Sequence, residues 1–271
     1  MKLTLKELQA LETEMLKEVS EICEESGIDY FIAYGSLIGA IRHKGPIPWD
    51  TDVDIAIRFE QLPLFLKAVR EELSDKFYVD FHDTNKDYLR FFPRIGMSGY
   101  ESRQLHLDVF LITGAPKHKE EQKILKDKAN YLGYILRYKN LKEGGFSFHK
   151  ISLKAKLVIY IRAFFMLFIS KRKLISRFEK LCMQYPYDSS DITVNISGGY
   201  YLKEFIPKRF YGKGLYKKYE GLQIRVPELY HEYLQHFYGD YMKFPPEEER
   251  ITNEFYYISK RFNSKVETVE N

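Results

Sequence analysis

The amino-acid sequence predicts an α/β protein, of the α+β kind with a mixed sheet, in which strands gather in the first half and the second half is mostly helical. Two patterns support this fold class. Short apolar runs typical of strands alternate in the first half with segments whose apolar residues recur at the three- and four-residue spacing of amphipathic helices. Apolar residues also make up 45% of the 271 residues, which is enough for a sizeable core.

The predicted elements follow in mixed order. Leu5 opens a helix that runs to about Cys23, because its apolar residues keep helical spacing and Thr4 with Glu7 fits a capping box. Gly27 then ends the helix. Further helices are expected over 37–41, 61–73 and 117–138, and strands over 30–34, 53–57, 77–81, 89–95 and 105–112.

Composition along the chain predicts four segments. Residues 1–145 hold the predicted strands and are expected to form the α/β core, and residues 146–185 form a basic amphipathic helical segment. Residues 186–250 are expected to complete the binding cleft, and residues 251–271 form a polar tail.

Charge and cysteine content exclude several classes of protein. A formal net charge of +4 is too small for the dense basic footprint of a nucleic-acid-binding surface, so no nucleic-acid partner is expected. Cys23 and Cys182 lack the spacing of a structural zinc site or a disulfide framework. The charged N-terminus lacks the apolar run of a signal peptide, which favours a cytoplasmic location.

The segment 34–54, YGSLIGAIRHKGPIPWDTDVD, carries the chemistry. Gly35 and Ser36 stand between a strand and a helix, where glycine lets a ligand approach the backbone and free N–H groups suit a phosphate. Asp52 and Asp54 flank one residue at the start of a strand. Their alternation places both carboxylates on one face, within reach of one hard cation.

Three further residues extend this pattern. Arg42 and Lys44 place positive charge on the following loop, where an anionic leaving group would be held. Asp108 lies in the apolar strand pattern LHLDVFLI, where an unpaired charge would be costly, and a metal ion is one partner that such an aspartate could have. Gly-Ser, Asp-x-Asp and a third strand aspartate together indicate a nucleotidyltransferase-like core. The alternative is a solvated turn in which the aspartates serve as caps.

These residues resemble a known family. GSLIGAIRHKGPIPWDTDVDI is similar to the signature of the LicD family, which includes bacterial phosphocholine transferases and is related to fukutin and fukutin-related proteins. The resemblance continues in LDVF around Asp108 and in the segment 219–246. One departure is Thr51, which stands where bacterial relatives have an aspartate, on the side expected to point away from the metal.

The resemblance implies transfer of phosphocholine from CDP-choline to a sugar hydroxyl of a cell-surface glycan, lipopolysaccharide or teichoic acid precursor, with release of CMP. It implies Mg²⁺ or Mn²⁺ as cofactor, a related CDP-alcohol as possible donor, and a glycan or lipid-linked oligosaccharide as acceptor. Asp52, Asp54 and Asp108 match the catalytic, metal-binding carboxylates. The phosphate-contacting turn and basic loop that bind the donor correspond to these residues: Gly35, Ser36, Arg42 and Lys44.

Several alternatives stay open. The cargo could be ribitol phosphate, glycerol phosphate or a nucleotidyl group, and the chain could instead be a membrane-associated scaffold without turnover. An aromatic cage would favour choline. Glu220 could meet the cation or a sugar hydroxyl, or be an ordinary surface charge. Candidates for the cage are six tyrosines of the second half: Tyr185, Tyr187, Tyr200, Tyr201, Tyr211 and Tyr216.

The apolar run Leu157–Ile169 has basic residues on both sides. It is too short to span a bilayer, which needs ~20 residues. A helix of this composition suits either the surface of an anionic membrane or the protein core, so the sequence allows a peripheral membrane location at the inner face of the cell membrane.

Overall fold

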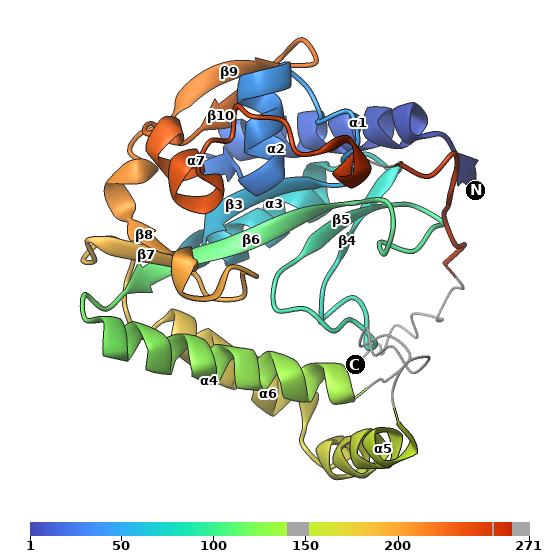
Figure 1. Cartoon of the computed structure of the whole chain (residues 1–271), viewed down its shortest axis with the longest axis vertical. Helices are drawn as coiled ribbons and strands as arrows, with labels where there is room; N and C mark the ends of the chain where they lie inside the picture. Colours follow the sequence, from blue (N-terminus) through green and yellow to red (C-terminus); the bar gives the residue numbers. More distant parts are fainter. Residues whose placement is uncertain (140–151, 251, 262–271) are drawn as a thin grey trace.

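The computed structural model describes residues 1–139, 152–250 and 252–261 (Figure 1). Its centre is a seven-stranded mixed sheet with the order β2-β3-β6-β5-β4, extended by β7 and β8 along the far half of β6. The fold class predicted from the sequence is therefore confirmed. The strands are β2 (Tyr30–Ile32), β3 (Val53–Arg58), β4 (Phe77–Asp80), β5 (Arg94–Met97), β6 (His106–Ala115), β7 (Ile192–Asn195) and β8 (Phe205–Pro207).

Helices cover both faces of this sheet. α1 (Leu5–Glu25) contacts β3, β6 and α3 (Leu62–Glu72), whereas α2 (Tyr34–Ile38) contacts β3 and α7 (Tyr230–Tyr238). The predicted capping box is present, because the Thr4 hydroxyl accepts from the Glu7 N–H and the Glu7 carboxylate accepts from Thr4. α2 continues as one π-helical turn over Gly39–His43, which extends the predicted helix at both ends.

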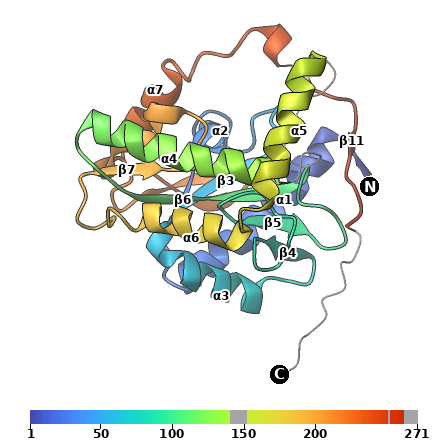
Figure 2. The same cartoon turned by 90° about the horizontal axis from the view of Figure 1, so that it is seen from below.

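A second, smaller core lies where α4 (Lys119–Tyr138) packs on α6 (Lys171–Cys182) and β7. Figure 1 shows α4 and α6 below the sheet, with α5 (Leu153–Leu167) beyond them, and Figure 2 shows the same helices from below. The expected segment 146–185 thus contains α5 and α6, although residues 146–151 lie outside the described residues.

α5 settles one question that the sequence left open. Most of its large apolar side chains are exposed, including Phe165 at 62% and Phe168, just after it, at 75%. The buried-core interpretation of the run 157–169 is therefore wrong. No helix in the described ranges is long and apolar enough to cross a membrane.

The second half holds more strand than the sequence predicts. Besides β7 and β8, a hairpin forms from β9 (Leu215–Tyr219) and β10 (Leu222–Val226). The predicted strand 89–95 is wrong over most of its length, since only its last residues belong to β5. β1 (Lys2–Leu3) pairs with β11 (Tyr256–Tyr257), so part of the expected tail is ordered against the N-terminus; residues 251 and 262–271 are outside the described ranges.

Candidate active site

Topology brings the Gly-Ser turn to the Asp-x-Asp motif. β2 runs antiparallel to β3, so the carboxyl end of β2 lies beside the amino end of β3. The Ala33 N–H donates to the Asp54 carbonyl at 2.9 Å, and α2 starts immediately afterwards. The two halves of the motif, separated by a loop in the sequence, therefore meet at one edge of the sheet.

Ser36 has a structural task at this junction. Its side chain is 3% exposed, and its hydroxyl oxygen accepts a hydrogen bond from the Asp54 N–H at 2.9 Å. Ser36 thus fixes the start of β3, and it does not line the cleft described below. Gly35 does line that cleft, and a Cβ at this position would approach an Asp50 carboxylate oxygen to 3.0 Å.

The acidic side chains converge on the start of β3. Asp54 and Asp108 are direct partners across the parallel strands β3 and β6, so their side chains share one face. Burial and the charges of Asp52 and Asp108 raise the pKa of Asp54 well above its usual range. Burial and the charge of Asp52 raise the pKa of Asp50 to about 7. These shifts indicate a concentration of negative charge that the nearby Arg94 guanidinium offsets only in part.

Asp108 differs because it has a cationic partner. The Arg94 guanidinium donates to both Asp108 carboxylate oxygens, at 2.5 and 3.3 Å, from the neighbouring strand β5. Burial would raise the pKa of Asp108, but the His106 imidazole and the Arg94 guanidinium hold it below its ordinary value. The structure therefore places Asp108 beside Asp54 but engages it in a buried ion pair.

The carboxylates fit a divalent cation only in part. In the described part of the chain, no three His, Cys, Asp or Glu side chains are arranged to hold a metal ion as they stand. Mg²⁺, however, is usually bound through one or two carboxylates together with substrate phosphates and water. Asp52 is exposed and Asp54 is half-buried, both beside the cleft, so this pair matches that kind of site.

A cleft of about 700 Å³ opens over these carboxylates. One side comes from the first motif and includes Asp50, Asp52 and Asp54. The other side comes from the C-terminal part of the chain, so residues within 186–250 help to form the cleft. Aromatic side chains from both sides line it: Tyr34, Trp49, Phe110, Tyr200, Tyr238, Tyr241 and Phe244.

Only one of the two basic residues predicted for this site lies in the cleft. Arg42 lines the cleft, where it donates to the carbonyls of Tyr241 and Lys243 at 2.7 and 3.3 Å and lies 4.6 Å from the Phe244 ring centroid. Lys44 is exposed, adopts φ 58° and does not line the cleft. Of the predicted site residues, four line the cleft, namely Gly35, Arg42, Asp52 and Asp54, whereas Ser36, Lys44 and Asp108 do not.

Sequence reasoning missed three polar residues. The predicted site does not include Asp50, yet this residue lines the cleft. Arg94 gave the same signal as Asp108, a charge within an apolar strand pattern, and was not singled out. Glu12 on α1 is 1% exposed, one of its oxygens has no hydrogen-bond partner among the described residues, and burial followed by the charge of Asp52 raises its pKa. No sequence signal marked Glu12, because it sits on the apolar face of an ordinary amphipathic helix.

The aromatic side chains that line the cleft are mostly not the tyrosines proposed from the sequence. Of the six tyrosines proposed from the sequence, Tyr200 lines the cleft, where its ring stacks on Tyr34 with centroids 5.7 Å apart. Tyr211 is buried, and Tyr216 donates to Glu24 on α1. Glu220 does not line the cleft.

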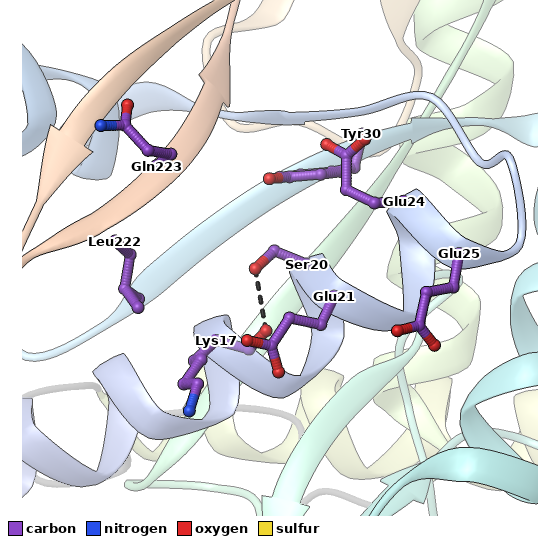
Figure 3. A pocket seen from close by; sticks show the side chains of 8 residues that line it. All are labelled: Lys17, Ser20, Glu21, Glu24, Glu25, Tyr30, Leu222 and Gln223. Atoms are coloured by element: carbon purple, nitrogen blue, oxygen red, sulfur yellow. Dashed lines mark hydrogen bonds between the residues drawn. The ribbon is translucent and has the colours of Figure 1, made fainter.

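A smaller pocket of about 220 Å³ lies between α1 and β10 (Figure 3). Its acidic side chains, Glu21, Glu24 and Glu25, all come from α1, and Ser20 donates to the carbonyl of Lys17. None of the residues singled out from the sequence lines this pocket.

Comparisons with known proteins agree with the motif. Residues 27–143 match the LicD/FKTN/FKRP nucleotidyltransferase domain. The chain is 29% identical over 263 residues to the lipopolysaccharide cholinephosphotransferase LicD of Haemophilus influenzae, covering 92% of this chain and 95% of that protein. A 49-residue stretch is 44% identical to the human ribitol 5-phosphate transferase FKRP, covering 18% of this chain and 10% of that protein.

Among solved structures, the antibiotic-resistance factor ANT(2'')-Ia overlaps 65% of this chain and 93% of its own, with 11% identity and a TM-score of 0.30, too low to support an argument. The similarity to the LicD family rests instead on the amino-acid sequence, including the motif residues that line the cleft. Residues 27–143 are therefore similar to the nucleotidyltransferase domain of the LicD family, and the similarity to LicD itself extends over nearly the whole chain.

Proposed function

We propose that this protein transfers phosphocholine from CDP-choline to a sugar hydroxyl of a cell-surface glycan or teichoic acid precursor and releases CMP, with Mg²⁺ or Mn²⁺ as cofactor. The similarity to a cholinephosphotransferase over nearly the whole length of both chains supports a phosphotransferase acting on a phospho-alcohol. The observation that carries the proposal is the convergence of Asp50, Asp52 and Asp54 under one cleft with too much negative charge for its surroundings.

Asp52 and Asp54 would hold the cation between them. When bound, such a cation neutralises charge on the donor diphosphate during an in-line displacement. The sugar oxygen forms a bond to the phosphorus that bears choline, and the bond from that phosphorus to the oxygen of CMP breaks. With Asp108 bound to Arg94, Asp50 is the cleft carboxylate placed to accept the proton of the attacking hydroxyl.

In this proposal Asp108 acts on Asp54 across the sheet rather than directly on the metal, because Arg94 already occupies both of its oxygens. Arg94 in turn donates to the Ser102 carbonyl at 2.8 Å, which fixes the guanidinium in place. The pair thus holds the strand partner of Asp54 in place, and its guanidinium partly offsets the negative charge of Asp52 and Asp54.

The aromatic lining favours choline over a polyol as cargo. Quaternary ammonium groups bind over aromatic faces. Tyr200 stands between Tyr34 and Tyr238, with ring centroids 5.7 Å from each. Ribitol phosphate remains the second candidate, because the chain also resembles a ribitol 5-phosphate transferase over 49 residues.

We also propose that α5 holds the protein against an anionic membrane, where a lipid-linked acceptor would be found. Its apolar side chains face solvent, and exposed cations lie at its start and just beyond its end. Aromatic residues combined with basic flanks suit the interface of an anionic bilayer. The cations nearest this face are Lys154, Arg172 and Lys173.

Donor competition tests the proposed reaction. The purified protein is incubated with Mg²⁺, a sugar acceptor and either CDP-choline, CDP-ribitol or CDP-glycerol, and CMP release is measured. We expect the fastest release from CDP-choline and none after chelation of the metal. Asp52→Ala should abolish release, whereas Asp87→Asn, an exposed loop aspartate, serves as the matched control. Near-normal turnover of a folded Asp52→Ala variant would refute the metal role, and absence of release from all three donors would support the scaffold alternative.

A further inference from the structure

A second cavity adjoins the proposed catalytic cleft. It has a volume of about 660 Å³ and lies between α4 and the segments before β5 and after β7. The two cavities share Gly198 and Gly199 in their walls. Phe92 of the second cavity also packs on Phe110 of the cleft, with ring centroids 4.6 Å apart. A substrate longer than one sugar could therefore occupy both spaces.

The shared Gly-Gly wall is firmly held. The Lys126 side chain is fully buried, and its ammonium group donates to the carbonyls of Asn195, Ile196 and Gly198 at 3.4, 3.0 and 2.7 Å. On the other side, Glu204 accepts from the Tyr200 N–H at 2.9 Å. A Cβ at Gly198 would lie 2.1 Å from the Glu204 carboxylate, so the backbone must pass close to this group.

The second cavity has the opposite charge to the cleft. Arg90, Lys126 and Arg137 line it, and no carboxylate does so within the described chain. Lys126 is occupied by the carbonyls of the wall, but Arg90 and Arg137 form no ion pair with any described residue. Burial, followed by the charge of Arg94, lowers the pKa of Arg90, and the charge of Arg137 acts in the same direction.

The remaining walls suit a sugar. Tyr131, Tyr134 and Tyr201 contribute aromatic rings, and the hydroxyl groups of Tyr134 and Tyr201 already make hydrogen bonds within the protein. The stacked pair of Phe91 and Phe178, with centroids 4.0 Å apart, adds an apolar surface. Aromatic faces with polar edges combine apolar contact and hydrogen bonding. Asp127, which follows Lys126 on α4 and does not line the cavity, already accepts from Lys123 and Tyr201.

We propose that Arg90 and Arg137 form a subsite for a phosphate-bearing sugar of the acceptor, next to the sugar that receives the transferred group. Guanidinium groups bind phosphate through paired, charge-assisted hydrogen bonds, and two unpaired arginines in one cavity gain most from such an anion. This assignment rests on the proposed function, since it takes the neighbouring cleft to hold the donor. The acidic cleft and the basic subsite would together fix which end of the acceptor meets the donor.

Calorimetry on the full chain tests the subsite without any need for turnover. The probes are glucose 6-phosphate, glucose and CMP. We expect glucose 6-phosphate to bind at least ~10-fold more tightly than glucose, a ratio equivalent to about 1.4 kcal/mol. The double variant Arg90→Gln/Arg137→Gln should abolish that preference and leave CMP binding unchanged. Lys128→Gln, an exposed cation of α4 outside the cavity, should behave like the wild type.

Three results would overturn the assignment. The double variant could keep the preference for the phosphorylated sugar, which would show that the arginines do not read the phosphate. CMP binding could fall in parallel, which would show that the donor nucleotide binds in this cavity. Lys128→Gln could lose the preference equally, which would show a diffuse charge effect. Failure of the proposed reaction would instead appear as absent CMP release with phosphate-sugar binding intact.

Discussion

Asp52 and Asp108 belong to one acidic group but stand in different electrostatic settings. Asp52 is exposed beside the cleft, whereas Asp108 is 7% exposed and paired with Arg94. Removing one partner of a buried ion pair leaves the other charge unpaired, which typically costs ~3–5 kcal/mol. Removing an exposed carboxylate from a cluster of like charges relieves repulsion instead.

Substitution by asparagine should therefore separate the two roles. We expect Asp52→Asn to lower turnover by at least ~100-fold, since a metal carboxylate contributes several kcal/mol to transition-state stabilisation, without lowering the free energy of unfolding. Asp108→Asn should lower the free energy of unfolding by ~3 kcal/mol or more. Chemical denaturation and initial rates of CMP release measure both effects. Equal loss of stability in the two variants would contradict this division.

The sequence correctly predicted that Asp54 and Asp108 lie on neighbouring strands, and the register of β3 on β6 puts these two residues on one face of the sheet. It could not place Ser36 or Lys44. The direction of a side chain in a turn depends on hydrogen bonds made far along the chain, such as that of the Asp54 N–H to Ser36 or of the Glu220 N–H to the Lys44 carbonyl. Alternation gives no information of that kind.

At the scale of elements, the π-helical turn after α2 packs closely against the backbone of the loop that follows it. A Cβ on Gly39 would lie 2.5 Å from the Gly45 carbonyl oxygen, a backbone atom that cannot move aside cheaply. This contact holds the π-helical turn against the loop that leads to the aspartates. The glycine thus serves backbone packing, in addition to any approach of a ligand.

Alanine at Gly39 should lower the melting temperature by several degrees, because ~1–3 kcal/mol of overpacking strain must be absorbed. Gly133→Ala is the matched comparison. Gly133 lies within α4, where an added Cβ meets only ordinary contact at 3.8 Å and alanine is the better helix former by ~1 kcal/mol. Thermal unfolding followed by circular dichroism should therefore show opposite shifts. A stabilised Gly39→Ala variant would show that the loop around Gly45 can move away from the added methyl group.

α5 provides a second prediction about an element. Replacing the exposed Phe164, Phe165 and Phe168 with serine should weaken binding to vesicles containing anionic lipid, because apolar area that enters the bilayer interface is lost. Arg172→Gln/Lys173→Gln should weaken binding to anionic vesicles but not change binding to neutral ones. Vesicle sedimentation measures both. Neither variant removes a buried side chain, so melting temperatures should stay near the wild-type value, and unchanged sedimentation of both would refute membrane contact.

Elements with strong local periodicity were predictable, and those formed by distant pairing were not. α1, α3 and α4 match their predicted spans within a few residues. The strands β7, β8, β9 and β10 are short, and β7 exists because it pairs with the end of β6, about eighty residues earlier in the chain. The run 89–93 was apolar for another reason, since Phe91 and Phe92 pack into two different cores.

At the scale of the whole molecule, the chain closes on itself around the cleft. The first motif and the C-terminal segment lie at opposite ends of the sequence, and Arg42 joins them by donating to the carbonyls of Tyr241 and Lys243. Its Nε also donates to the His43 ring at 2.9 Å, and its guanidinium lies over Phe244. The sequence suggested that Arg42 holds an anionic leaving group. These contacts show instead that Arg42 acts as a clamp, which holds the C-terminal segment against the first motif.

Arg42→Lys distinguishes the two roles, because lysine keeps the charge but loses the planar, forked donors. If Arg42 is a clamp, both Arg42→Lys and Arg42→Met should raise the KM for the donor by ~10-fold or more, as expected from losing charge-assisted hydrogen bonds of ~1.5–3 kcal/mol. Both should also speed proteolytic cleavage within residues 241–250. We expect this result, since the guanidinium donors are already engaged by the protein. Restoration of KM by lysine alone, with proteolysis unchanged, would instead assign Arg42 to the anionic leaving group.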